Sequence, residues 1–257
     1  MIPKIIHYCW LSEDAYPENI KKCIESWKTR LPDYEIMLWS LDRDDIGSSI
    51  WVQEAFAHKK YAFAADYIRF YALYHYGGIY LDSDVEVLRN FSDLLQLPYF
   101  VGFDSFGLLE AAVLAAEAGN PWIKQCLDYY NGRHFVLNNG GLDTTTLPQI
   151  MKNIIGKRYT VVHLDKFYSP YVLDEYLYVH SYTYFSPKRH DTGAICVQDF
   201  TYTIHHYAMS WIPYEIRLIV KVKQVLMLVL GTTFVNYLIR VFSLRKIKNH
   251  LLRKNCR

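Results

Sequence analysis

Two aspartates, Asp82 and Asp84, follow a double glycine and a short apolar segment in the stretch Gly77-Gly78-Ile79-Tyr80-Leu81-Asp82-Ser83-Asp84. Strand alternation is expected to place both carboxylates on one side, roughly 6.5 to 7 Å apart along the backbone, with Ser83 on the other. With neither His nor Cys beside them in the sequence, paired carboxylates favour Mg²⁺ or Mn²⁺ over zinc, and such an ion could hold a diphosphate. An isolated Asp-x-Asp is also common in solvated turns and helix caps, so its meaning depends on the segments around it.

The segment before the double glycine predicts a buried helix that carries two charges. Residues 51–76 are expected to be mostly helical, in one or two pieces, and both faces around Asp66 and Arg69 are apolar. Buried charges cost several kcal/mol unless they are paired or bound, so these two side chains satisfy each other or a ligand. A structural i,i+3 ion pair and a ligand-binding pair both remain open.

The elements that position these residues follow the pattern of a parallel α/β sheet. A strand over 5–10, a helix from Pro17 to about Arg30 and a strand over 34–39 open the chain, and a right-handed crossover is expected. Sheets of this kind bind ligands at the carboxyl ends of their strands, where Asp82 and Asp84 are expected. Further elements are predicted as strands over 79–81, 99–102, 160–164 and 202–206, and as helices over 108–118, after Pro121 and over 147–155.

Composition and charge argue against several classes of protein. The chain has 257 residues with 51% hydrophobic and 21% charged residues, which excludes a disordered chain or a disulfide-stapled miniprotein, and its five widely spaced Cys fit a reducing compartment. Residues 213–257 hold ten Lys or Arg against one acid, whereas residues 1–212 carry a net charge of −7. Because nucleic-acid binding needs clustered positive charge, the acidic body argues against a nucleic-acid partner.

The basic segment predicts an amphipathic helical tail, residues 213–257, attached to a catalytic domain over residues 1–212. Only sixteen residues separate Lys223 from Arg240, fewer than the about 20 apolar residues that span a bilayer, so an interfacial helix against anionic lipid is expected. Packing of this helix on the body or on a second copy is the alternative. Since the chain opens without a long apolar stretch, we expect a peripheral protein on the cytoplasmic face of the inner membrane.

Three motifs of the chain resemble those of a known family. Residues 65–69 together with residues 77–84 are similar to the sugar-binding region of glycosyltransferase family 32, which contains bacterial capsule and lipopolysaccharide transferases and yeast α-mannosyltransferases. The same region is similar to the catalytic domain of clostridial glucosylating toxins. Residues 2–10 resemble the first strand of the family, and residues 204–211 resemble its closing motif.

The resemblance implies an α/β fold of the GT-A type, a Rossmann-like nucleotide-sugar-binding sheet flanked by helices, with Mn²⁺ or Mg²⁺ as cofactor. The residues that it implies for the donor site are Trp10 against the base, Asp66 and Arg69 on the sugar and phosphate, Asp82 on the ribose or sugar hydroxyls, and Ser210 and Trp211 over the diphosphate, with Tyr80 and Ser83 as further donor-binding residues. The implied catalytic residues are Arg69, Asp82 and Asp84, and the implied metal ligands are Asp82, Asp84, His205 and His206.

Two of these assignments keep alternatives. Adjacent residues on a strand point to opposite sides, so one histidine at most is expected to face the metal, and His205 is favoured because Tyr207 follows it by two positions. Core packing is the alternative role for Trp10 and Trp211.

The function implied is a retaining transferase that moves a hexose or N-acetylhexosamine from a sugar nucleotide, by family habit a uridine diphosphate, to a lipid-linked saccharide in capsule or O-antigen synthesis. Front-face attack without a covalent intermediate is expected, since the carboxylates weighed as nucleophiles, Asp104, Glu110 and Asp143, are expected at the surface. The alternatives are a toxin-like effector that glycosylates a protein, a non-catalytic sugar-nucleotide-binding module and a metal-dependent phosphohydrolase.

Overall fold

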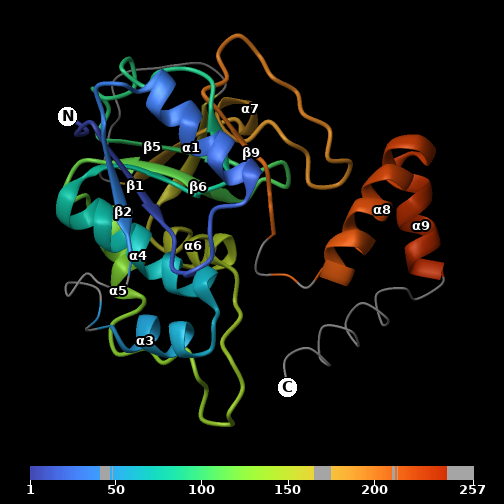
Figure 1. Ribbon diagram of the computed structural model, residues 1–257, viewed down its shortest axis with the longest axis horizontal. Helices are drawn as coiled ribbons and strands as arrows, with labels where there is room; N and C mark the ends of the chain where they lie inside the picture. The colour runs from blue at the N-terminus through green and yellow to red at the C-terminus, as the bar shows by residue number, and fades with distance from the viewer. Residues whose placement is uncertain (41–46, 48, 165–174, 210–211, 213, 242–257) are drawn as a thin grey trace. The chain divides into compact units, whose positions relative to one another are not determined.

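The computed structural model describes residues 1–40, 47, 49–164, 175–209, 212 and 214–241. The chain divides into two compact units (Figure 1). The first consists of Met1–Pro187 with Val197–His206, and the second consists of Lys188–Cys196 with the chain from Tyr207 onward. The sequence-based boundary between residues 212 and 213 stays a prediction.

A seven-stranded sheet forms the centre of the first unit, in the order β2-β1-β3-β6-β5-β8-β7. Strand β6 runs antiparallel to both of its neighbours, and the other pairings of this sheet are parallel. The carboxyl ends of β1, β3, β5 and β8 and the amino end of β6 therefore share one edge. The bounds are β1 Ile5–Cys9, β2 Glu35–Trp39, β3 Gly78–Leu81, β5 Tyr99–Phe103, β6 Leu109–Ala116, β7 Thr160–Leu164 and β8 Tyr176–His180.

Two apolar cores cover the two faces of this sheet, because alternate residues of each strand point to opposite sides. Tyr80 of β3 belongs to one core, and its neighbours Ile79 and Leu81 belong to the other. The first core packs helices α3 Ile50–Ala57, α4 Tyr61–Tyr76, α5 Pro121–Asp128 and α6 Leu147–Ile155. The second contains α1 Glu18–Arg30, α7 Tyr182–Phe185 and a two-stranded antiparallel sheet of β4 Val85–Val87 and β9 Thr203–His205. The predicted fold class, an α/β sheet flanked by helices, is confirmed.

The double glycine joins α4 to β3 with a close backbone approach. Gly77 and Gly78 have φ values of +66° and +106°, which side chains other than glycine rarely adopt. A Cβ atom on Gly78 would lie 2.7 Å from the carbonyl oxygen of Ile5, and the Nε2 atom of His7 lies 2.8 Å from the Gly77 carbonyl oxygen. The turn thus places β3 directly against β1 and fixes the end of β3, which Asp82 and Asp84 follow.

The prediction of a helix over residues 108–118 is wrong. Most of this alanine-rich stretch is strand β6, all eight residues of which are buried between β3 and β5. A strand buried on both faces is continuously apolar, so periodicity cannot separate it from a buried helix. Strands β4 and β8 and helix α7 were also not predicted, whereas the other predicted elements are present with boundaries shifted by a few residues.

Among its described residues, the second unit contains the helices α8 Tyr214–Leu230 and α9 Thr232–Val241, which contact each other. Gly231, with a φ of +83°, separates them. The described part of the tail, residues 214–241, is therefore helical as predicted, and it forms two helices where one was expected. Of the helices that the structure describes, none has the length and apolarity needed to cross a bilayer.

We predict that Gly78→Ala destabilises the protein by more than Gly119→Ala. Both positions have positive φ, which costs an L-residue about 1 to 2 kcal/mol. At Gly119 a Cβ would meet nothing within 4 Å, whereas at Gly78 it would lie 2.7 Å from the carbonyl oxygen of Ile5 and 3.2 Å from Nε2 of His7. Urea unfolding followed by circular dichroism measures both free energies, and equal losses would contradict this account of the turn.

Candidate active site

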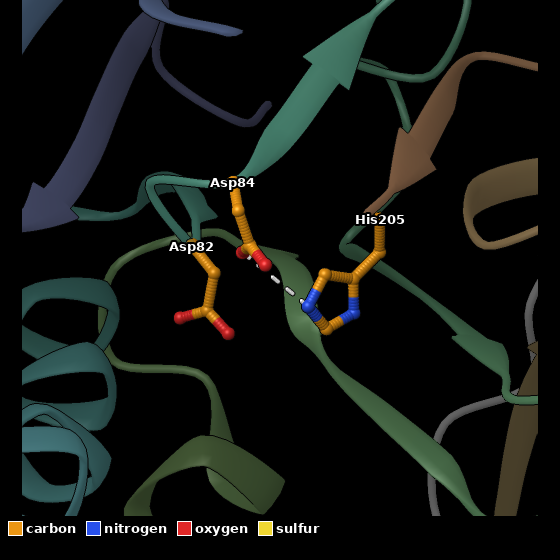
Figure 2. A group of neighbouring side chains, drawn as sticks. All are labelled: Asp82, Asp84 and His205. Carbon is orange, nitrogen blue, oxygen red and sulfur yellow. Dashed lines mark ion pairs between the residues drawn. The ribbon is translucent and has the colours of Figure 1, made fainter. Parts of the chain in front are cut away.

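A tight turn at the end of β3 presents the two aspartates. The amide of Asp82 donates to the carbonyl oxygen of Ala112 at 2.9 Å, and the amide of Val85 donates to the carbonyl oxygen of Asp82 at 3.0 Å. The expectation that residues 82–84 continue the strand is therefore wrong, because the chain turns there to begin β4. Carboxylate oxygens of Asp82 and Asp84 and a ring nitrogen of His205 nevertheless lie within 4.8 Å of one another (Figure 2).

Strand β9 brings His205 to this turn. His205 pairs with Val85, the residue that follows Asp84, and its Nε2 atom lies 3.4 Å from Oδ1 of Asp84. The next side chain, His206, lies against β4, with its Nε2 atom 2.8 Å from Oε2 of Glu86. The structure thus brings His205 to the aspartate pair and places His206 in a separate pair.

Arg69 of α4 is buried, and it links the helix to the aspartate turn. Its guanidinium donates to Oδ1 of Asp66 at 3.0 Å and to the carbonyl oxygen of Ala111 at 2.6 Å, and it lies 3.4 Å from Oδ1 of Asp82. Burial raises the pKa of Asp66 to about 7 and also raises the pKa of Asp82, while Arg69 opposes both shifts. The structural ion pair left open by the sequence is therefore present, and Arg69 also holds Asp82. A direct contact of Asp66 or Arg69 with the donor stays a prediction.

Glu110 at the start of β6 is a site residue that the sequence did not identify. We expected it at the surface, but it is 5% exposed, and its Oε1 atom lies 3.4 Å from Nδ1 of His205. Burial opposes its ionisation, but His205, the amide of Ala112 and the hydroxyl of Ser186 outweigh burial and lower the pKa of Glu110 to about 2. Burial likewise lowers the pKa of His205, but Asp84 and Glu110 together raise it well above its usual value. Because residues 108–118 were expected to form a helix, the burial of Glu110 beside His205 was not predicted.

The other carboxylates weighed as nucleophiles are engaged in local turns. Asp104, expected at the surface, is 7% exposed, and its Oδ1 atom accepts hydrogen bonds from the amides of Phe106 and Leu108. Asp143 accepts hydrogen bonds from the amide and the hydroxyl of Thr145. These hydrogen bonds hold both carboxylates within their own turns.

The other residues predicted to bind the sugar-nucleotide donor differ in their surroundings. Trp10 follows β1, is partly exposed, donates from its indole N–H to the carbonyl oxygen of Asp14 and packs against Tyr16 at 4.8 Å between ring centroids. Tyr80 is 1% exposed and lies 4.6 Å below the guanidinium of Arg69. Ser83 is half-buried within the turn. Ser210 and Trp211 lie outside the described residues. Roles of all five in donor binding stay predictions.

The Asp82–Asp84–His205 cluster is suited to a divalent cation. Carboxylate oxygens and an imidazole nitrogen are ligands that Mn²⁺ accepts, and Mg²⁺ uses the oxygens. Two carboxylates this close also repel each other unless positive charge lies between them. The donor set therefore fits the metal that the sequence predicted, without distinguishing Mn²⁺ from Mg²⁺.

Part of this sequence matches a known protein family, and several known proteins are similar to it. Residues 17–101 match the family described as "Glycosyltransferase sugar-binding region containing DXD motif". A mannosyl phosphorylinositol ceramide synthase of Saccharomyces cerevisiae is 28% identical over 197 residues, which are 72% of this chain and 50% of that protein. Inositol phosphoceramide mannosyltransferase 3 of Schizosaccharomyces pombe is 34% identical over 128 residues, 48% of this chain and 36% of that protein. The chain thus spans half or less of the length of these relatives.

Two solved structures are similar to parts of this chain. The PaToxG glycosyltransferase has a TM-score of 0.42 at 22% identity, and covers 60% of this chain and 70% of its own. The apo form of the glycosyltransferase GlyE of Streptococcus pneumoniae has a TM-score of 0.47 at 15% identity, and covers 87% of this chain and 60% of its own.

We predict that Arg69→Met destabilises the fold by about 3 to 5 kcal/mol, because it leaves the buried Asp66 and the half-buried Asp82 without their cation. Adding Asp66→Asn to this variant removes one of the two uncompensated charges, so the double variant is expected to recover part of the loss. Chemical denaturation of the three proteins tests this, and a loss below about 1 kcal/mol for Arg69→Met, the size of a surface pair, would contradict the account.

We also predict that Mn²⁺ raises the melting temperature of the wild type, as binding to the folded state alone must do. Asp84→Ala and His205→Ala should abolish or strongly reduce the shift, whereas His206→Ala should leave most of it because His206 faces Glu86. Thermal-shift measurements over a Mn²⁺ titration make the comparison. An equal loss in the two histidine variants would argue against the assignment of His205.

Proposed function

We propose that this chain, whose residues 17–101 match the sugar-binding region family of glycosyltransferases, transfers a hexose or N-acetylhexosamine from a nucleoside diphosphate donor to an acceptor hydroxyl. The observation that carries the proposal is the meeting of Asp82, Asp84 and His205 at the carboxyl edge of a mostly parallel sheet. Two of these residues lie inside the matched region, and open α/β sheets bind their ligands at this edge.

The chemistry requires stabilisation of the negative charge that grows on the leaving diphosphate. A Mn²⁺ or Mg²⁺ ion held by Asp82, Asp84 and His205 would supply positive charge against it. The guanidinium of Arg69 contacts the carboxylate of Asp82, and the Asp82 amide is hydrogen-bonded to Ala112 of β6. The metal ligands are therefore held in position before the donor binds.

We propose retention of configuration by front-face attack. The acceptor oxygen bonds to the anomeric carbon as the bond from that carbon to the diphosphate oxygen breaks, and the hydroxyl proton passes to that phosphate oxygen. No carboxylate nucleophile is required. In support, Asp104 and Glu110 both accept backbone amide hydrogen bonds that hold them in the protein framework.

The proposed acceptor is lipid-borne. The yeast relatives are named for mannose transfer to inositol phosphoceramide, and the family resemblance includes bacterial capsule and lipopolysaccharide enzymes. These substrates share a sugar or polyol headgroup on a lipid. We therefore propose a lipid-linked saccharide in bacterial capsule or O-antigen synthesis, at the cytoplasmic face of the inner membrane.

Helices α8 and α9 support a peripheral membrane attachment. Their exposed surface is rich in large apolar side chains, among them Val225, Val229 and Phe234, and Arg217, Lys221, Lys223 and Arg240 lie on the same two helices. An apolar surface flanked by basic residues is typical of helices that lie in the interface of an anionic bilayer. The basic residues from Arg245 onward extend this charge in sequence.

The other functions make different predictions. A toxin-like effector would modify a protein acceptor, and a non-catalytic module would bind the donor without turnover. A metal-dependent phosphohydrolase would release phosphate without an acceptor. The family match favours transfer over hydrolysis of phosphate.

We predict that one sugar nucleotide, with Mn²⁺, raises the melting temperature more than the others and is slowly hydrolysed to sugar and nucleoside diphosphate. The screen includes uridine and guanosine diphosphate donors of glucose, galactose, N-acetylglucosamine and mannose, because the named relatives transfer mannose. Asp84→Ala should lose both effects. Equal responses to every nucleotide, unchanged in Asp84→Ala, would contradict the proposed function.

We predict that the full chain sediments with vesicles containing phosphatidylglycerol and that added salt weakens this binding. Val229→Glu places a charge on a side chain that is 73% exposed on α8 and should release the protein. Val197→Glu is a matched control outside the two helices, with 49% exposure, and should bind like the wild type. Equal release of both variants, or binding to neutral vesicles alone, would contradict the attachment.

A further inference from the structure

Two carboxylate–histidine pairs lie side by side on β4, β6 and β9, and they differ in what the histidine faces. In one, Glu86 contacts Nε2 of His206 at 2.8 Å and both side chains are about a third exposed or more. In the other, Glu110 faces Nδ1 of His205 at 3.4 Å and both side chains are largely buried. Only the second histidine belongs to the Asp82–Asp84–His205 cluster.

We propose that Glu110 is a positioning residue that fixes the ring of His205 so that Nε2 is directed at the metal beside Asp84. This inference rests on the metal site of the proposed function and adds a residue to it. Glu110 does not itself belong to the cluster of carboxylate and imidazole ligands found among the described residues.

Glu110 is suited to this role because its own carboxylate is held. Oε1 accepts a hydrogen bond from the amide of Ala112 at 3.0 Å, and the hydroxyl of Ser186 is a further donor to the same carboxylate. Ser186 follows α7 and is fully buried, so the two donors come from different elements. A carboxylate fixed from two sides is a rigid reference point for the imidazole.

The two nitrogens of His205 face different carboxylates. Nδ1 lies 3.4 Å from Glu110 and Nε2 lies 3.4 Å from Asp84 (Figure 2 shows the latter pair). A carboxylate opposite Nδ1 favours a proton on that nitrogen, which leaves the lone pair of Nε2 for a metal ion. The contact with Glu110 thereby selects both the tautomer and the orientation of the ring.

Strand β6 connects this carboxylate to the other ligands. The carbonyl oxygen of Ala111, next to Glu110, accepts from Arg69, and the carbonyl oxygen of Ala112 accepts from the Asp82 amide. The short segment 110–112 thus holds Asp82 through its backbone and His205 through a side chain. It sets the spacing between two ligands that are 123 residues apart in the sequence.

The test measures the dissociation constant of Mn²⁺ alone by electron paramagnetic resonance of the free ion, using the full chain without donor. Glu110→Ala should weaken binding by roughly 10- to 100-fold, the usual effect of losing such a partner. Glu110→Gln, which keeps an oxygen that can accept from Nδ1, should weaken it less. Glu86→Ala, which disrupts the neighbouring pair, should leave the constant within about twofold of the wild type.

A double-mutant cycle separates positioning from direct ligation. If Glu110 acts through His205, then Glu110→Ala in a His205→Gln background should change the Mn²⁺ constant by no more than about twofold. A full effect that persists in that background would overturn the positioning role, and so would a Glu110→Ala constant equal to that of the wild type. Melting temperatures of Glu110→Ala and Glu110→Gln identify loss through unfolding, since Gln retains the size of the side chain. Failure of the wild type to bind Mn²⁺ would instead reject the metal site itself.

Discussion

Negative charge concentrated at one edge of the sheet is the constraint on which the site depends. Asp66, Asp82, Asp84 and Glu110 are all buried or half-buried there, and Arg69 and His205 are the cationic or potentially cationic side chains that contact them. Desolvated carboxylates are costly unless positive charge faces them. Arg69 serves Asp66 and Asp82, and His205 lies between Asp84 and Glu110. A divalent cation among Asp82, Asp84 and His205 would complete the compensation.

The fold brings these charges together from distant parts of the sequence. Helix α4 supplies Asp66 and Arg69, the turn after β3 supplies Asp82 and Asp84, and β6 and β9 supply Glu110 and His205. The double glycine and the hydrogen bonds from β6 fix the turn, so its geometry depends on backbone contacts more than on the carboxylates. A site built on rigid elements can bind charge without a large rearrangement.

Much of this arrangement could be predicted from local sequence, and the failures have physical causes. The opening strand, helix and strand, the buried α4 and the glycine turn all have local signals in apolar spacing and glycine placement. Strand β6 was mistaken for a helix because burial on both faces removes the alternation that identifies a strand. That error concealed Glu110, whose contacts with His205 of β9 and with Ser186 after α7 no local pattern encodes. The turn at Asp82–Val85 was not predicted; one of its hydrogen bonds is local, between Val85 and Asp82, but the other joins Asp82 to the distant Ala112, which no local pattern encodes.

The cation site can be tested most directly by diffraction from crystals of the protein soaked in Mn²⁺, with an anomalous difference map recorded at a wavelength where manganese scatters anomalously. Our account predicts an anomalous peak in coordinating contact with carboxylate oxygens of Asp82 and Asp84 and with Nε2 of His205, with Glu110 on the far side of the ring. A peak elsewhere, or His205 turned away from Asp84 with no manganese between the aspartates, would contradict it.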